Sequence, residues 1–173
     1  MLDIRQVKIS QSNFNMPKNI LLTVLILLFS CWQQAKIEGK VVSVKDGDTI
    51  EILYKNKPVR IRLYGIDCPE KNQDFGTKAK EYTSTLCFGK TVKVKSFGKD
   101  KYGRLLGQVI LPDSKQLNEE LVRAGMAWRY KYSKDQYLAQ LETTARKNKI
   151  GLWKGKDPVA PWEFRLIKRK VPR

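Results

Sequence analysis

The sequence predicts a mainly β fold with added α structure, in which a small barrel of five short strands is accompanied by three helices. Short β-branched segments come first, and Asp-Gly, Lys-Asn-Lys and Asp-Lys-Tyr-Gly turn sequences separate them. Segments with helical spacing of apolar residues interrupt or follow these strands. With 42% hydrophobic and 10% aromatic residues, the 173-residue chain can build the core of one domain.

The first three strands are expected to form a meander at residues 37–44, 49–54 and 58–66. In the third strand, apolar and basic residues alternate in the order Val59, Arg60, Ile61, Arg62 and Leu63. Because neighbouring side chains of a strand point to opposite faces, both arginines should point away from the core. The remaining strands are expected at residues 92–95 and 105–111.

Three segments are predicted to be helices. The first ends at Gly89 and has one apolar stripe, formed by Phe75, Ala79, Tyr82 and Leu86. The second is short, with Asn118 as its N-cap and Gly125 at its end. The third opens with a capping box from Ser133 to Gln136, and its inner face is formed by Leu138, Leu141 and Ala145.

The N-terminal segment is predicted to be a leader rather than part of the fold. Residues 20–29 form an apolar run, which is shorter than the ~20 residues of a membrane span and suits a signal-peptide core. The sequence from Leu28 to Cys31 resembles a bacterial lipobox. Lipidation of Cys31, cleavage near Ala35 and an uncleaved anchor stay open, and translation could start at Met16. We expect an exported protein that is secreted, periplasmic or lipid-anchored to a bacterial membrane.

The chain carries 34 basic and 17 acidic residues, a formal net charge of +17. Such a charge attracts polyanions such as nucleic acids, and binding to a membrane surface is the alternative. The absence of histidine excludes Ser-His-Asp and Cys-His catalysis, His-ligated zinc and nucleases with a histidine base. Acid–base chemistry must use carboxylates, lysine, tyrosine or cysteine. Cys68 and Cys87 are expected to be unpaired.

Acidic residues and an arginine lie at two predicted strand ends. Asp48 follows an Asp-Gly turn, and Asp67 and Glu70 follow the strand that carries Arg62. The three acidic groups could hold a hard divalent cation and leave one carboxylate to polarise a water molecule. Taken singly, each residue has a structural alternative, such as a turn, a solvated loop or a cross-strand ion pair.

Five motifs in order resemble those of the thermonuclease family, typified by staphylococcal nuclease: Asp-Gly-Asp-Thr, Arg-Leu-x-Gly-Ile-Asp-x-Pro-Glu, Asp-Lys-Tyr-Gly-Arg, Asn-Glu-x-Leu-Val-Arg-x-Gly and Gly-Leu-Trp. The stretch from Pro161 to Arg165 resembles the ending of bacterial members. The resemblance implies an OB-fold and a calcium-dependent phosphodiesterase that acts on DNA and RNA. The chain then divides into a leader at 1–35, a nuclease domain at 36–155 and a basic C-terminal tail at 156–173.

The resemblance also implies roles for individual residues. Asp48 and Asp67 become calcium carboxylates, with the main-chain carbonyl of Cys68 as a further ligand. Glu70 becomes the general base that activates water. Cys68 stands where the type member has threonine, an exchange that a main-chain ligand tolerates.

Substrate contacts are implied for a second group of residues. Arg62 and Arg104 match arginines that grip the scissile phosphate. The matches near the terminal phosphate and near the bound base are Lys101, Tyr102, Tyr130 and Tyr132. The implied partners are DNA and RNA, with single-stranded or frayed regions favoured, and we expect a monomer without a protein partner. A catalytically inactive OB-fold module that binds single-stranded nucleic acid is the second hypothesis.

Overall fold

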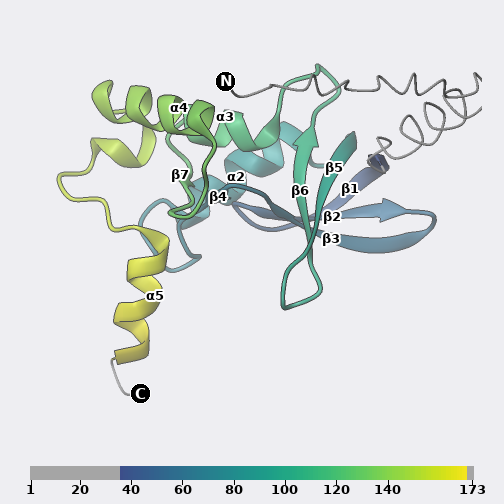
Figure 1. Cartoon of the computed structure of the whole chain (residues 1–173), viewed down its shortest axis with the longest axis horizontal. Coiled ribbons are helices and arrows are strands. Elements are labelled where there is room, and N and C mark those ends of the chain that lie inside the picture. Colours follow the sequence, from purple (N-terminus) through teal and green to yellow (C-terminus); the bar gives the residue numbers. More distant parts are fainter. Residues whose placement is uncertain (1–35, 171–173) are drawn as a thin grey trace, which may run out of the picture. The chain divides into compact units, whose positions relative to one another are not determined.

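The structure is a computed structural model that describes residues 36–170 (Figure 1). The expected leader at 1–35, with its lipobox, alternative start and cleavage sites, lies outside the described residues, as do residues 171–173. No helix within residues 36–170 is long and apolar enough to cross a membrane.

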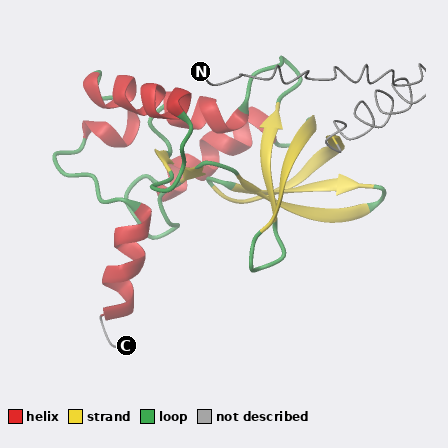
Figure 2. Cartoon of the chain, in the orientation of Figure 1, coloured by secondary structure: helices red, strands yellow, loops and turns green. Residues whose placement is uncertain are grey.

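Five strands close into a barrel, as predicted, and the structure gives their order as β1-β2-β3-β6-β5 (Figure 2). Their bounds are Lys36–Asp46 for β1, Thr49–Tyr54 for β2, Lys57–Leu63 for β3, Thr91–Lys99 for β5 and Leu105–Ile110 for β6. The β3–β6 pair is parallel, and the other neighbours are antiparallel. The apolar core inside these strands includes Val41, Ile50, Ile52, Ile61, Val92, Val94 and Val109.

The expected third strand, 58–66, is divided in the structure. β3 ends at Leu63, and Gly65 adopts a left-handed conformation with φ of 80°. The chain then forms β4 (Ile66–Asp67), which pairs with β7 (Trp128–Arg129) outside the barrel. A glycine takes this conformation without a steric penalty, so the chain can turn here and carry Asp67 to a second, small sheet.

The three predicted helices are present as α2 (Gly76–Cys87), α3 (Leu117–Arg123) and α4 (Gln136–Lys147), and a 3-10 helix, η1, covers Gly151–Lys154. A fourth α-helix, α5, covers Pro161–Lys170, inside the stretch described from sequence only as a basic tail. Its sequence carries helix signals: Pro161 at the start, Glu163 in the first turn and three basic residues in the last.

Asn118 is not the N-cap of α3, because Gln116 takes that position and Leu117 is drawn fully into the core. The Asn118 side chain is buried and joins the helix to the barrel. Its Oδ1 accepts the Val109 amide at 3.0 Å, and its Nδ2 donates to the Tyr64 carbonyl at 2.8 Å.

One further detail of the predicted helices was wrong. The N-cap of α4 is Asp135 rather than Ser133, because the Asp135 carboxylate accepts hydrogen bonds from two amides in the first turn.

The predicted apolar stripe of α2 packs on the core through Ala79, Tyr82 and Leu86. Its most deeply buried line also includes Thr83 and Cys87, which were not predicted from the sequence.

A second cluster of buried residues lies outside the barrel and is built on tryptophans. The ring of Trp128 in β7 packs edge-on against Trp153 at 4.4 Å and against Trp162 of α5 at 5.7 Å. The guanidinium of Arg146 stacks over the Trp153 ring at 3.8 Å. These contacts fix the first turn of α5, while its far end extends away from the barrel in Figure 1.

Candidate active site

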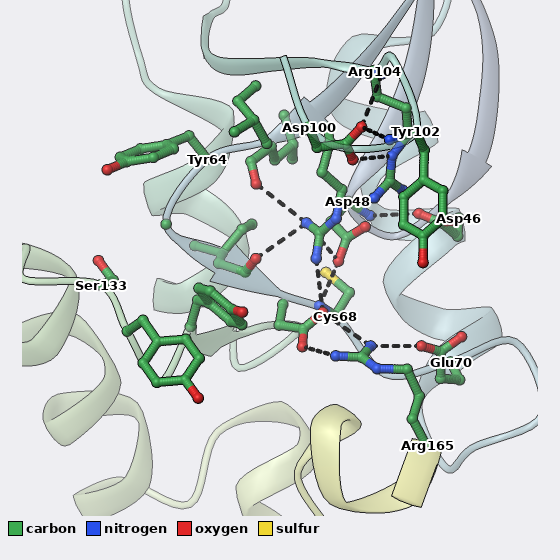
Figure 3. Close-up of a pocket in the computed structure, with 18 of the residues that line it drawn as sticks. Asp46, Asp48, Tyr64, Cys68, Glu70, Asp100, Tyr102, Arg104, Ser133 and Arg165 are labelled. Atoms are coloured by element: carbon green, nitrogen blue, oxygen red, sulfur yellow. Dashed lines mark hydrogen bonds and ion pairs between the residues drawn. The ribbon is translucent and has the colours of Figure 1, made fainter. Parts of the chain in front are cut away.

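A pocket of about 720 Å³ lies where β3, β4 and the β5–β6 loop meet α5 and the segment that follows β7. Figure 3 shows most of the side chains that line it. All ten residues singled out from the sequence line this one pocket: Asp48, Arg62, Asp67, Cys68, Glu70, Lys101, Tyr102, Arg104, Tyr130 and Tyr132. Their separation in sequence is large, so the barrel and the β4–β7 pair bring them together.

Asp48 is held in the tight β1–β2 turn. A Cβ atom on the preceding Gly47 would lie 2.7 Å from Cys68 Cβ and 2.9 Å from Ala79 Cβ, so only glycine lets the turn approach α2 so closely. The Gly47 carbonyl accepts a hydrogen bond from Thr83 Oγ1 at 2.6 Å. The Asp48 Oδ2 atom in turn accepts the Cys68 amide at 2.7 Å, which links the turn to the loop after β4.

Arg62 joins the two predicted metal carboxylates. Its Nη1 atom lies 2.9 Å from Asp48 Oδ2, and its Nη2 atom lies 2.7 Å from Asp67 Oδ1. Nη1 also donates to the carbonyls of Leu63 and Ile66, at 3.2 and 3.1 Å. The side chain is 14% exposed and points away from the barrel core, as the strand alternation predicted. The guanidinium is therefore fixed by several acceptors at once.

A third arginine, Arg165 of α5, also binds the acidic residues. Its Nη2 atom lies 2.6 Å from Asp67 Oδ2, and its Nη1 atom lies 2.7 Å from Glu70 Oε1 (Figure 3). Asp67 is 1% exposed, so its buried charge is balanced by two guanidiniums. Partial burial acts to lower the pKa of Arg165, but both carboxylates outweigh it and raise this pKa above its usual value.

The electrostatic environment of the pocket fits a bound cation. Burial raises the pKa of Asp48 to about 7, Arg62 opposes this shift, and the nearby Asp46 and Asp67 carboxylates add to it. Carboxylate oxygens this close repel one another, and a hard dication such as calcium would relieve that repulsion. The donor chemistry of Asp48, Asp67 and a main-chain carbonyl therefore suits calcium.

Arg62 and Arg165 take up the carboxylate oxygens in the geometry seen here. Within residues 36–170, no group of three or more His, Cys, Asp or Glu side chains is arranged to hold a metal ion. The predicted calcium set contains only two such side chains, Asp48 and Asp67, together with a backbone oxygen. Any cation at this point therefore shares the acidic groups with the two arginines.

Arg104 is oriented from the opposite wall of the pocket by the β5–β6 loop. Its Nε atom donates to Asp100 Oδ2 at 2.7 Å, and Asp100 Oδ1 accepts the amides of Tyr102 and Arg104. Burial acts to raise the pKa of Asp100, but hydrogen bonds from Arg104 and the Tyr102 amide outweigh it and leave the pKa below 3.8. Among the described residues, the Nη atoms of Arg104 have no hydrogen-bond partner, which leaves them available to an anion.

Aromatic side chains form the outer part of the pocket. Tyr130 and Tyr132 form an edge-to-face pair with ring centroids 5.5 Å apart, and the Tyr130 amide donates to the Gly65 carbonyl. Tyr102 and Tyr132 are both largely exposed, with lysine ammonium groups close to their rings. Such rings can stack with unpaired nucleobases.

Sequence reasoning missed Arg165, Asp100 as the group that orients Arg104, and Tyr64. Arg165 ends the Pro161–Arg165 stretch described above. It follows Trp162 by three residues, a spacing that puts both side chains on the same face of a helix and was the available signal. Cys68 and Cys87 are unpaired, as expected, and burial raises the pKa of both thiols.

Comparison with known proteins agrees with this geometry. The model of the family described as "Staphylococcal nuclease homologue" matches residues 60–155. An "uncharacterized endonuclease" of Escherichia coli is 49% identical over 144 residues, which cover 82% of this chain and 94% of that protein. A "micrococcal nuclease" of Shigella flexneri is 36% identical over 159 residues, covering 86% and 90%. An "uncharacterized endonuclease" of Haemophilus influenzae is 41% identical, covering 86% and 85%.

Proposed function

Because this chain belongs to the staphylococcal nuclease family, we propose that its pocket hydrolyses the phosphodiester bonds of DNA and RNA with the help of calcium. The observation that carries the proposal is the position of Arg62 between Asp48 and Asp67. Glu70 and Arg104 line the same pocket, so groups for a cation, a phosphate and a water molecule lie together.

The arginines are proposed to stabilise the transition state. Attack on a phosphodiester increases the negative charge on the non-bridging oxygens. Fixed guanidinium groups on two walls of the pocket therefore stabilise the transition state more than they stabilise the bound substrate. Arg62 is fixed by carboxylates, and Arg104 is fixed by Asp100. Neither side chain has to be ordered when the phosphate arrives.

Glu70 is proposed to accept a proton from the attacking water. Its carboxylate is partly exposed at the pocket, and its backbone is anchored because its amide donates to Gln73 Oε1 at 3.1 Å. A carboxylate base suits a protein without histidine. Calcium, when held by Asp48, Asp67 and the Cys68 carbonyl, would supply positive charge beside the phosphate.

The proposed substrates are single-stranded or frayed DNA and RNA, taken by a monomer. The exposed tyrosines of the pocket support this proposal, because bases must be unpaired to stack with them. The net charge of +17 supports attraction of the phosphate backbone.

A calcium titration with labelled single-stranded DNA, RNA and duplex DNA tests this function. We expect cleavage that requires calcium, stops with chelator, returns when calcium is restored and is faster on denatured than on duplex DNA. Full turnover after exhaustive chelation would refute the metal site. Tight binding without cleavage at any calcium concentration would instead support the inactive OB-fold module.

A further inference from the structure

Tyr64 and Phe97 form a stacked aromatic pair at the rim of the pocket. Their ring centroids are 4.3 Å apart and their planes differ by 13°. Both rings remain open to solvent, with 44% of Tyr64 and 39% of Phe97 exposed. Tyr64 lines the active-site pocket, whereas Phe97 lies beyond it, so the pair continues the pocket along the surface.

The backbone holds Tyr64 on both sides. Its amide donates to the Gly107 carbonyl at 2.8 Å, and its carbonyl accepts Asn118 Nδ2 at 2.8 Å. Tyr64 follows Arg62 by two residues, and two residues of extended chain span only ~7 Å. The backbone of Tyr64 therefore lies close to Arg62, while Figure 3 shows the Tyr64 ring pointing away from Asp48.

Phe97 lies beside a strand irregularity. The pairing of β5 with β6 shifts register between Ser96 and Lys99, and Gly98 has a φ of 101°. Such a bulge changes the direction of the side chains next to it. Phe97 has the same parity along β5 as Lys93 and Lys95, opposite to the buried Val92 and Val94, so strand alternation already places its ring on the outer face, and the bulge turns the chain directly after it.

The surroundings of the pair are basic. The Nζ atom of Lys95 lies 5.4 Å from the centre of the Phe97 ring, and Lys93 and Lys99 on the same strand are exposed. Of the acidic residues nearby, Asp100 is paired with Arg104, and Glu38 of β1 stands opposite Lys93 in the strand register. Among the described residues, Lys95 and Lys99 form no ion pair, so the ring pair lies on a surface with a positive excess, which suits a ligand with flat bases and a negative backbone.

We propose that the Tyr64–Phe97 pair is a stacking subsite for a nucleobase beyond the two that flank the scissile phosphate, in addition to the surface formed by Tyr130 and Tyr132. Every base has a flat face, so the subsite favours longer single strands over dinucleotides without reading sequence. The choice of nucleic acid as ligand rests on the proposed function. The subsite itself concerns binding and is measurable without cleavage.

Binding in chelator to the full chain tests the subsite, because cleavage is then prevented. The probes are a fluorescent eight-nucleotide oligothymidylate and a thymidine dinucleotide. We expect Phe97→Ala to weaken octamer binding by roughly 5- to 100-fold, the fold-change that corresponds to one lost base stack, with dinucleotide binding nearly unchanged. Phe97→Trp should restore octamer affinity. Phe97→Leu, which keeps apolar bulk but no aromatic face, should not.

Phe88→Ala is the matched control, since Phe88 is 56% exposed and does not line the pocket. A series of octamers, each with one abasic nucleotide at a different position, locates the stacked base. The wild-type protein should bind one member of the series more weakly than the others, and Phe97→Ala should bind all members with similar affinity. Equal behaviour of Phe97→Ala and Phe88→Ala, or rescue by leucine, would overturn the subsite. Absence of cleavage in calcium with the abasic pattern intact would refute the proposed function and leave the subsite standing.

Discussion

The Nη2 atom of Arg165 lies 2.6 Å from Oδ2 of Asp67, although 98 residues separate the two. Arg165 reaches this position because Trp162, one helical turn earlier, packs against Trp128 of β7, the strand paired with β4. The same guanidinium contacts Glu70. A helix outside the barrel thus neutralises the carboxylates that we propose for metal binding and proton transfer.

The first prediction is that Arg165→Gln strengthens calcium binding. Arg165 and calcium would use the same oxygens of Asp67, so removal of the arginine removes a competing cation. Because Arg165 is 40% exposed, its ion pair is worth about 1 kcal/mol, and we expect affinity to rise roughly 5-fold. Isothermal titration of substrate-free protein with calcium measures this change.

Lys168→Gln serves as the control, because it removes one positive charge from the same helix without a contact to Asp67 or Glu70. It should change calcium affinity much less. Weaker calcium binding in Arg165→Gln would show that the arginine holds Asp67 in a binding position and does not compete.

The second prediction concerns the shape of the Arg62 side chain. Arg62→Lys keeps the charge, but an ammonium cannot contact Asp48, Asp67 and two carbonyls with the same fixed geometry. Turnover should fall by about 10² or more, while DNA affinity and its salt dependence change little. Arg60→Lys is the control, since Arg60 lies two residues earlier and pairs with Glu51 on the surface. If Arg62→Lys has near-normal turnover, Arg62 acts only through its positive charge, as part of the basic surface.

The third prediction assigns a positioning role to Asp100. Asp100→Asn keeps an oxygen for the Tyr102 amide but loses the charged contact with Arg104 Nε. We expect turnover to fall roughly 10- to 100-fold, the range for groups that orient a ligating side chain. If kcat of Asp100→Asn falls while its oligonucleotide affinity is retained, the loss comes from the orientation of Arg104 and not from unfolding of the protein.

The pH dependence of stability provides a second test of Asp100. Its pKa in the folded protein lies below the ordinary 3.8, so the charged form stabilises the fold at neutral pH. This contribution is present above pH ~4 and is lost as pH falls through the lowered pKa. In urea unfolding, the difference between wild type and Asp100→Asn should therefore be constant from pH 7 to 5 and shrink in more acidic solution. A difference that grows in acid would contradict the assignment.

The site could be largely predicted from sequence because its residues sit in short motifs at strand ends. There, the turn geometry around Gly47 and Gly65 fixes where Asp48 and Asp67 lie. The helical spacing of Arg165 from Trp162 could show that both lie on one face of α5, but the docking of that face against Trp128 depends on tertiary packing.

The cap residues show a similar limit. Ser133 and Asp135 are both good N-caps, and Asp135 takes the position because its carboxylate accepts two amides. Asn118 is also a favourable cap, but burial of Leu117 moves the start of α3 so that Asn118 bonds to the barrel. Where two neighbouring residues are both suitable N-caps, packing against the core determines which one starts the helix. That packing cannot be read from a single sequence.

The fourth prediction is that both thiols of the domain are inert in the folded protein. Burial raises the pKa of Cys87 to about 12 and that of Cys68 well above its usual value, so neither forms a thiolate at pH 8. In a Cys31→Ser background, a thiol reagent should label no cysteine before unfolding and both cysteines after addition of urea. Labelling of either cysteine in the native protein would contradict their burial.

The final prediction separates chemistry from binding at Glu70. Glu70→Gln keeps the size and hydrogen-bonding capacity of the side chain but cannot take a proton from water at neutral pH. General base catalysis typically contributes ~10² to 10⁴ in rate, so we expect a loss of that size with single-stranded DNA binding within a few-fold of wild type. Cleavage of labelled DNA beside a binding titration measures both. Arg165→Gln, measured at saturating calcium, is the comparison, because it also breaks the Arg165–Glu70 contact but leaves the carboxylate in place. If the Glu70→Gln variant cleaves at the wild-type rate, Glu70 is not the base and the proton must leave by another route. If both variants lose activity equally, turnover requires Arg165 and its contacts with Glu70 and Asp67, and the loss in Glu70→Gln does not report on basicity.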